Sequence, residues 1–201
     1  MVYLDLAAVA ATRLHRDPFE HLLLDHALFS ESATAITCDF PGIHKPGSFA
    51  LADVKAGPAV RQLIAELDSH AFRELMAEKF DVDLVGKPTV FTLRGVCAAR
   101  DGRIHTDSRA KILSVLIYLN LSWTPEGGRL RLLRNGRDID AFTTEIEPTF
   151  GKMVAFLRTD RSWHGHRPCQ GERRVLQMSY VGSAKTSLIS DLRHRVSALM
   201  K

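Results

Sequence analysis

Hydrophobic positions in the first part of the chain, up to about residue 80, recur at helical spacing. The clearest case is residues 58–80, where apolar side chains return every three or four positions and predict an amphipathic helical stretch. Its apolar positions are Val60, Leu63, Ile64, Leu67, Phe72, Leu75 and Met76. Asp17-Pro18 predicts the opening of a helix or turn. Residues 42–57 are rich in Gly and Pro, which predicts a loop that could cover a site.

From residue 87 the pattern changes to short strands separated by turns. We expect strands at 89–98, 111–119, 128–133, 139–146, 152–157 and 173–181. Short, evenly spaced strands are typical of a sandwich or barrel of the jelly-roll type. Residues 112–119 are apolar on both faces, so one face should line the barrel and the other should lie under the N-terminal helices. Residues 186–200 are expected to form a helix.

Composition places these elements in one globular domain. The chain has 201 residues, of which 45% are hydrophobic and 25% charged, and this balance is typical of a soluble protein. We expect mainly helical support over 1–86, the jelly-roll core over 87–181 and a C-terminal helix over 182–201. No apolar run is long enough to cross a membrane, and the N-terminus lacks the basic residue of a secretory signal. A cytoplasmic location is therefore expected.

The cysteines and the net charge give less information about the function. Cys38, Cys97 and Cys169 lie far apart with no C-x-x-C pair, so we expect neither a disulfide framework nor a zinc-thiolate site, and a reducing compartment fits best. The formal net charge is +4, with arginines clustered between residues 94 and 174, near the candidate metal-binding residues described next. They could attract an anionic substrate, but solvated strand edges and loops are the favoured interpretation. Binding to nucleic acid is not expected, because no recognised nucleic-acid module accompanies the charge.

Candidate metal chemistry is concentrated in His105-Thr106-Asp107 and His164. Two imidazoles and one carboxylate bind a divalent first-row metal on one side and leave positions open for an organic chelator and dioxygen, as in non-haem Fe(II) oxygenases. Residues i and i+2 project to the same side of an extended backbone, so His105 and Asp107 can reach one ion. His164 is the candidate third ligand. Arg174 begins an alternating strand and could bind a carboxylate bidentately.

These residues lie in stretches that resemble the iron and 2-oxoglutarate-dependent dioxygenases of the prolyl-4-hydroxylase type. The resembling stretches follow in collinear order: IHTD at 104–107, LSVLIYLN at 113–120, PEGGRLRLL at 125–133, IEPTFGKMVAF at 146–156, SWHGHRP at 162–168 and GERRVLQMSYV at 171–181. DPFEHLLLDHAL at 17–28 and DFP at 39–41 match, more weakly, the opening segment of many bacterial members. The resemblance implies an α+β fold with a double-stranded β-helix (jelly-roll, cupin-like) core and N-terminal helices packed on the major sheet.

The resemblance also implies roles for individual residues. His105, Asp107 and His164 would bind Fe(II), and Arg174 would pair with the distal carboxylate of 2-oxoglutarate, assisted by Tyr118 of the YLN motif. Strand parity adds Ser114, Leu116 and Leu130 to the same pocket, although plain barrel core is an alternative for them. The implied cosubstrates are 2-oxoglutarate and O2, with ascorbate as a candidate reductant.

Several alternatives stay open at this point. His166, two residues from His164, could be the distal ligand, although the ten-residue gap to Arg174 favours His164. Arg173 competes with Arg174, but adjacent strand residues point to opposite faces, and the same spacing leaves Arg173 facing solvent. Tyr118 could instead be a core tyrosine, and Trp163 could either support the ligand set or pack in the core.

The expected activity is hydroxylation of an unactivated C–H bond with release of succinate and CO2. Halogenases that resemble this family replace the ligand acid by a small residue, whereas Asp107 is present here. Residues 42–57 and 95–104 would shape the entrance for a peptidyl-prolyl, saccharide or other small-molecule substrate. A jelly-roll module that binds a small ligand without catalysis is the main alternative, and a nucleic-acid demethylase, suggested only by the basic charge, is a third.

Overall fold

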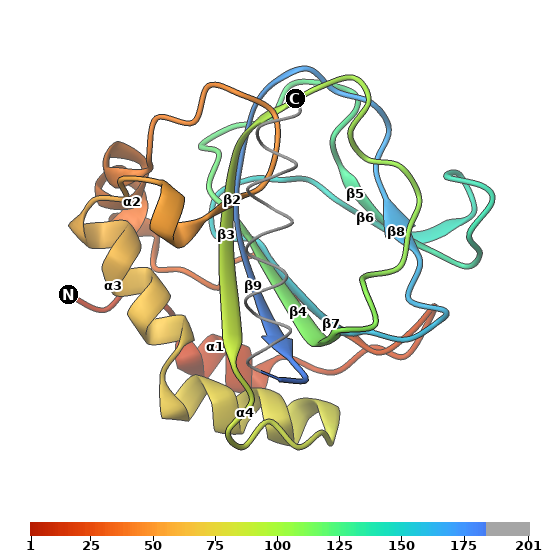
Figure 1. Ribbon diagram of the computed structural model, residues 1–201, viewed down its shortest axis with the longest axis horizontal. Helices are drawn as coiled ribbons and strands as arrows, with labels where there is room; N and C mark the ends of the chain where they lie inside the picture. The colour runs from red at the N-terminus through yellow and green to blue at the C-terminus, as the bar shows by residue number, and fades with distance from the viewer. Residues whose placement is uncertain (184–201) are drawn as a thin grey trace.

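The computed structural model describes residues 1–183, in which two antiparallel sheets face each other (Figure 1). The strand order of the major sheet is β1-β7-β4-β9-β3-β2, and that of the minor sheet is β6-β5-β8. The major strands are β1 (His21–Leu24), β7 (Met153–Leu157), β4 (Lys111–Tyr118), β9 (Gly171–Val181), β3 (Thr89–Cys97) and β2 (Phe49–Ala50). The minor strands are β6 (Phe142–Ile146), β5 (Leu130–Leu133) and β8 (His164–Gly165). This is the double-stranded β-helix expected from the sequence.

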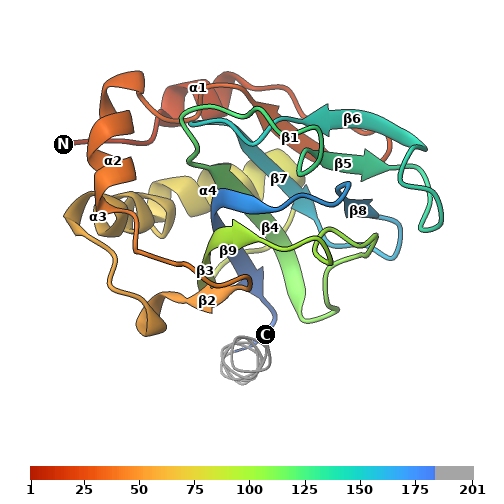
Figure 2. The same cartoon turned by 90° about the horizontal axis from the view of Figure 1, so that it is seen from above.

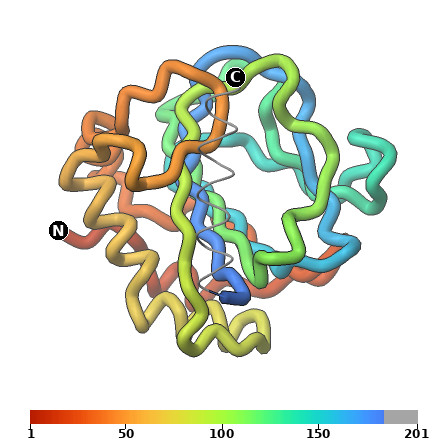
Figure 3. The backbone as a smooth tube through the Cα atoms, in the orientation of Figure 1, coloured from red at the N-terminus to blue at the C-terminus, as the bar shows by residue number. Residues whose placement is uncertain are grey.

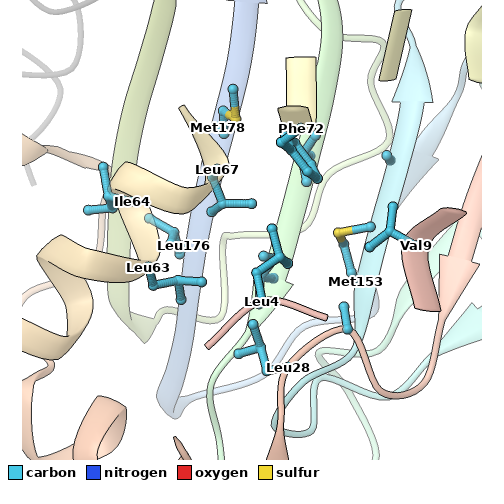
Figure 4. Packing of buried hydrophobic residues seen from close by; sticks show 14 of the residues in the cluster. Leu4, Val9, Leu28, Leu63, Ile64, Leu67, Phe72, Met153, Leu176 and Met178 are labelled. Atoms are coloured by element: carbon cyan, nitrogen blue, oxygen red, sulfur yellow. The ribbon is translucent and has the colours of Figure 1, made fainter. Parts of the chain in front are cut away.

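Helices cover the outer face of the major sheet. They are α1 (Leu6–Ala11), α2 (Ala33–Asp39), α3 (Pro58–Leu67) and α4 (His70–Phe80), with short 3-10 turns at Ser30–Ser32 and Leu51–Asp53. Figure 2 shows them on one side of the sheet, with β5, β6 and β8 on the other. In Figure 4 the α3 side chains Leu63, Ile64 and Leu67 lie against Leu176 and Met178 of β9. The larger hydrophobic core is therefore the layer between helices and sheet.

The predicted helical stretch at 58–80 is two helices. Asp68 ends α3, and the Ser69 side chain caps α4 by accepting a hydrogen bond of 3.2 Å from the Phe72 amide. Such a cap satisfies an amide that the first helical turn leaves without a partner. The break turns α4 so that Phe72 and Met76 both reach the core.

A second, smaller core fills the space between the two sheets. It contains Phe19, Tyr118, Leu130, Leu132, Ile146, Val154, Phe156 and Val175, with Leu116 packed against it. Alternate residues of β4 belong to the two cores: Leu113, Val115 and Ile117 face the helices, and Tyr118 faces the barrel. The prediction that this strand is buried on both faces is confirmed.

The strand predictions from residue 87 onward are confirmed, with ends shifted by a few residues, but three short strands were not expected. β1 lies in a region predicted to be helical or connecting, and its HLLL run is too short for periodicity to distinguish the two. Asp17-Pro18 was expected to open a helix or a turn, and the structure has the turn: residues 17–20 bend directly into β1. β2 interrupts the predicted loop at 42–57, and β8 is only two residues long.

Two further expectations concern the C-terminal segment and membrane-spanning helices. The helix predicted at 186–200 lies outside the described residues. Within residues 1–183, no helix combines the length and the apolar character needed to span a membrane.

The connection between β3 and β4 leaves the major sheet and runs along the minor one, as the backbone tube in Figure 3 shows. His105 in this connection forms an antiparallel bridge with His164 of β8. The bridge extends the minor sheet by one position beyond its three strands. Two histidines that are 59 positions apart in the chain are thus placed side by side.

The core beneath the helices gives a first prediction. Leu63 is fully buried, so Leu63→Ala should lower the free energy of unfolding by about 2–5 kcal/mol, because the lost contacts leave a cavity. Val85→Ala is the matched control, since Val85 is 82% exposed and a surface change of this kind is usually within about 0.5 kcal/mol. Equilibrium denaturation measures both. Equal effects of the two substitutions would contradict the packing described.

Candidate metal centre

His105, Asp107 and His164 converge at one end of the barrel. One ligand atom from each lies within 4.8 Å of the other two. Backbone hydrogen bonds hold the histidines together: the His105 amide donates to the His164 carbonyl (3.0 Å), and the His164 amide donates to the His105 carbonyl (2.9 Å). Asp107 follows two residues after His105. The structure therefore brings together all three residues that the sequence nominated as ligands.

Both imidazoles are oriented by backbone carbonyls. Nδ1 of His105 lies 2.9 Å from the Arg103 carbonyl oxygen, and Nδ1 of His164 lies 2.9 Å from that of Ser162. A carbonyl only accepts, so in each ring Nδ1 carries the hydrogen and Nε2 keeps its lone pair. This is the arrangement that fixes metal-binding histidines in proteins.

Asp107 is buried and held as a carboxylate. Lys111 Nζ donates to its Oδ1 (2.9 Å), and Ser114 Oγ donates to its Oδ2 (2.5 Å). Burial alone would raise the pKa of Asp107, but the charge of Lys111, the charge that His164 carries at low pH and the Ser114 hydrogen bond outweigh it and lower the pKa below its usual range. Burial, aided by neighbouring His105, lowers the pKa of His164 to about 4. At neutral pH the centre thus has a charged carboxylate beside a neutral His164 imidazole.

This donor set fits Fe(II). Two imidazoles and one carboxylate on one side of an ion are the facial triad of non-haem iron oxygenases, with the remaining positions open. Asp107 and His164 are buried, whereas His105 is exposed, so the centre lies at the mouth of the barrel. Each carboxylate oxygen of Asp107 accepts one hydrogen bond, from Lys111 or from Ser114, and each keeps a further lone pair that can bind a metal.

Two buried polar side chains, Tyr118 and Arg173, lie together at the inner core. Tyr118 is fully buried, and its hydroxyl has no hydrogen-bond partner among the described residues. The Arg173 guanidinium carbon lies 5.3 Å from the centre of the Tyr118 ring, and Arg173 Nε donates to the Gly128 carbonyl (2.8 Å). Within residues 1–183 no carboxylate forms an ion pair with Arg173. A buried cation beside an unpaired hydroxyl fits the carboxylate of a small organic acid.

The prediction that Arg174 faces this pocket and Arg173 faces solvent is wrong. Arg173 is buried, whereas Arg174 pairs with Glu172 (2.6 Å) and donates to the Thr37 carbonyl of α2 (3.1 Å). The alternation of β9 is as predicted, but the face of Arg174 and Leu176 packs under the helices. Since both faces of β9 are buried, hydrophobicity alone could not show which one lines the barrel.

The other residues predicted for the pocket lie partly at the metal centre and partly in the inner core. Ser114 bonds Asp107 at the metal centre. Leu116 and Leu130 join Tyr118 in the inner core. Trp163 packs its ring over the turn at Gly136, where a Cβ atom would lie 2.8 Å from Cε2 of the indole.

Two residues at the metal centre were missed in the sequence. Lys111 contacts the Asp107 carboxylate, and Arg158 Nε donates to the Asp107 backbone carbonyl (3.1 Å). The spacing of four residues between Asp107 and Lys111 was a usable signal, since a turn between them leads directly into β4, which Lys111 begins. Arg158 follows β7, and no sequence pattern indicated its contact with Asp107. Of the clustered arginines away from the metal centre, four form ion pairs with carboxylates on the minor sheet and its loops: Arg129, Arg131, Arg134 and Arg167.

His166 lies apart from the three candidate ligands. It clusters instead with Cys97 and Cys169, and one ligand atom from each lies within 4.8 Å of the others. The choice of His164 over His166 therefore agrees with the geometry. The sequence suggested no zinc-thiolate site, but the structure brings two of the three cysteines together, because the pairing of β3 with β9 places Cys97 opposite Gly171, close to Cys169.

The two thiols of this cluster are coupled. A hydrogen bond from Cys97, partly offset by burial and reinforced by the charge of Arg173, lowers the pKa of Cys169 to about 7. The same hydrogen bond and burial raise the pKa of Cys97. Cys169 can thus supply a thiolate near neutral pH.

Comparisons with known proteins agree with this geometry. Residues 96–181 match the family model described as the 2OG-Fe(II) oxygenase superfamily. This segment contains the candidate triad, Tyr118 and Arg173. No protein of curated function is significantly similar to the chain in sequence.

Solved structures of prolyl hydroxylases have a similar fold. A Pseudomonas putida prolyl-4-hydroxylase has 19% identity and a TM-score of 0.59, with 89% of this chain and 99% of that chain covered. A Phytophthora capsici prolyl 4-hydroxylase has 17% identity and a TM-score of 0.61, with coverage of 99% and 75%. A Trichoplax adhaerens prolyl hydroxylase, solved with a hypoxia inducible factor peptide fragment, has 16% identity and a TM-score of 0.58, with coverage of 92% and 90%.

The two histidine clusters give the second prediction. His164→Ala should abolish binding of Fe(II) at the triad, because two protein ligands remain, whereas His166→Ala should leave that binding unchanged. Anaerobic titration with Fe(II), followed by calorimetry, measures both. Loss of iron binding in His166→Ala with retention in His164→Ala would reverse the assignment.

Proposed function

Because residues 96–181 match the model of the 2OG-Fe(II) oxygenase superfamily, we propose that this chain hydroxylates an unactivated C–H bond of a peptidyl-prolyl-type or small-molecule substrate, with release of succinate and CO2. The observation that carries the proposal is the presence of two features in one barrel. One is the His105, Asp107 and His164 cluster, and the other is the buried Arg173–Tyr118 pair without a carboxylate partner. An iron ligand set and a pocket for an organic acid are what this chemistry requires together.

The protein residues have separable roles. His105, Asp107 and His164 would hold the metal through Nε2, one carboxylate oxygen and Nε2. When bound, iron with 2-oxoglutarate and O2 supplies the oxidising chemistry that converts C–H to C–OH. Lys111 and Ser114 keep Asp107 ionised and fix its orientation. Arg173 would bind the distal carboxylate of 2-oxoglutarate, and the Tyr118 hydroxyl would donate to the same carboxylate.

Burial makes the acid pocket selective. Tyr118 is closed off from solvent by Leu130, Val154 and Val175 of the inner core. In such surroundings an ionic hydrogen bond is stronger than in water, and a cation left without a partner is costly. A ligand with carboxylates at both ends could bind the metal at one end and neutralise Arg173 at the other. This accounts for a dicarboxylic acid as cosubstrate.

For the substrate we place a peptidyl-prolyl group slightly ahead of a small molecule. The prolyl hydroxylase from Trichoplax adhaerens was solved with a peptide fragment, and its fold is similar over most of this chain. The exposed side of His105 leaves room for an extended peptide at the mouth. Following 2-oxoglutarate consumption with proline-containing peptides, saccharides and small metabolites separates these classes. Stimulation by metabolites alone would remove the peptide assignment.

A jelly-roll module that only binds a small acid is the alternative, since folds of this architecture also serve without catalysis. The Arg173–Tyr118 pocket would suit such a module equally well. The metal centre discriminates, because a module of this kind needs no iron. Near-stoichiometric iron after purification under anaerobic conditions favours the enzyme.

The third prediction concerns Asp107. Wild-type protein mixed anaerobically with Fe(II) and 2-oxoglutarate should give the weak visible charge-transfer band of the chelate, and Asp107→Ala should lose this band and succinate production because the metal loses its anionic protein ligand. The exposed carboxylate of Asp160 provides the control, and Asp160→Ala should keep both signals. Wild-type turnover in Asp107→Ala would show that the ligand assignment is wrong.

The fourth prediction separates the two arginines. Arg173→Ala should raise the apparent constant for 2-oxoglutarate by a factor on the order of a hundred to several thousand, because breaking a buried charge pair costs about 3–5 kcal/mol. Arg174→Ala should change it little, since Arg174 already pairs with Glu172 at the surface. Succinate release at varied 2-oxoglutarate concentration measures both.

Two further variants refine this comparison. Arg173→Lys keeps the charge but loses bidentate geometry, so its effect should be intermediate. Tyr118→Phe should cost about 0.5–3 kcal/mol, the range for a hydrogen bond to a neutral or charged group. A larger effect in Arg174→Ala than in Arg173→Ala would restore Arg174 to the site.

A further inference from the structure

A second cluster of metal-ligating side chains lies beside the candidate iron site. Cys97 ends β3, His166 follows β8, and Cys169 precedes β9. One ligand atom from each lies within 4.8 Å of the other two. In Figure 3 the two chain segments that carry them arch over the same end of the barrel.

The backbone around the cluster leaves room for two of these side chains, His166 and Cys169. The Gly102 carbonyl accepts a hydrogen bond of 2.9 Å from the His166 amide, and a Cβ atom at Gly102 would lie 2.4 Å from Nδ1 of His166. A Cβ atom at Gly128 would lie 2.8 Å from Sγ of Cys169. Both glycines have positive φ, 88° and 79°, which L side chains rarely adopt. Side chains at either position would displace a member of the cluster.

His166 is oriented like the two histidines of the iron site. Its Nδ1 lies 2.9 Å from the Arg167 carbonyl oxygen, so Nε2 keeps its lone pair. A disulfide between Cys97 and Cys169 would not require a histidine beside it. A metal ion would use the imidazole as its third protein ligand.

The chemistry of the donors selects the metal. Two sulfur atoms and one imidazole nitrogen are a soft set that favours Zn²⁺ over Fe(II), and three protein ligands leave a fourth tetrahedral position for water or an external ligand. Two thiolates neutralise the charge of Zn²⁺. The guanidinium groups of Arg94 and Arg173 lie close enough to act on Cys169 and favour its thiolate form, and Asp101, paired with Arg94 at 3.4 Å, opposes them.

We propose that Cys97, His166 and Cys169 form a zinc site that is separate from the iron triad. The ion would tie the end of β3 to the segment that joins β8, which carries His164, to β9, which carries Arg173. It would thereby hold the two sides of the barrel mouth together. The site does not depend on the proposed function, because it shares no ligand with the triad.

Cobalt(II) is the probe that tests the proposal. Wild-type protein, reduced and freed of metal, should give a thiolate-to-cobalt charge-transfer band in the near ultraviolet, and one equivalent of Zn²⁺ should remove it. Cobalt at the triad gives no such band, since that site has no sulfur ligand. Cys97→Ser and Cys169→Ser should each weaken or abolish the band, and His166→Gln should reduce cobalt affinity.

Two controls separate this site from other possibilities. Cys38→Ser should keep the full band, because Cys38 is the exposed cysteine outside the cluster. Asp107→Ala should also keep it, so a failure of the iron assignment leaves the result unaffected. If the cysteine variants do not fold, mass spectrometry of alkylated wild-type protein should show that Zn²⁺ protects Cys97 and Cys169 but not Cys38.

The overturning results are equally direct. A reduced wild-type protein without the thiolate band would refute the zinc site, as would a band that survives unchanged in both cysteine variants. Equal alkylation of Cys97 and Cys169 with and without Zn²⁺ would also refute the zinc site. A protein that forms a Cys97–Cys169 disulfide and binds no cobalt after reduction would assign the pair to redox chemistry instead.

Discussion

The two reciprocal backbone hydrogen bonds between His105 and His164 are the constraint on which the rest of the site depends. They connect the long β3–β4 segment to β8, which is otherwise a two-residue strand paired only on its β5 side. With this pair in place, strand geometry places Asp107 beside the two imidazoles, because i and i+2 share a side. The carbonyls of Arg103 and Ser162 then set the rings. Ligand geometry thus follows from main-chain pairing between segments that are distant in sequence.

The same dependence on distant pairing explains which parts of the site could be predicted from the sequence. His105-Thr106-Asp107 is a local pattern that can be recognised as a candidate ligand pair without knowledge of the fold. The neighbouring arginines were different, because β9 is largely buried on both faces, and its more apolar side, with Leu176, Met178 and Tyr180, packs under the helices and does not line the barrel. Only the packing of Leu176 and Met178 under α3 shows that Arg173 points into the barrel. The cysteine cluster left no sequence signal, since Cys97 and Cys169 meet through the β3–β9 register alone.

The fold divides along similar lines. Strands of five or more residues were predicted to within a few positions, because alternation or continuous apolar runs of that length are distinctive. β1, β2 and β8 have two to four residues each and depend on their partners for existence. The break between α3 and α4 was also missed. There the apolar periodicity continues through Asp68 and Ser69, and only the cap formed by Ser69 ends one helix and starts the next.

The buried pocket carries a cost that a ligand can remove. A buried hydroxyl without a partner costs about 1–3 kcal/mol, and Tyr118 is in this state beside the cation of Arg173. Leu130, Val154 and Val175 pack around the pair and prevent water from reaching it freely. A carboxylate that accepts from Tyr118 and neutralises Arg173 would satisfy both groups at once, so its binding would stabilise the folded protein. An organic acid would therefore meet groups that are already in place, and satisfying them would add to its affinity.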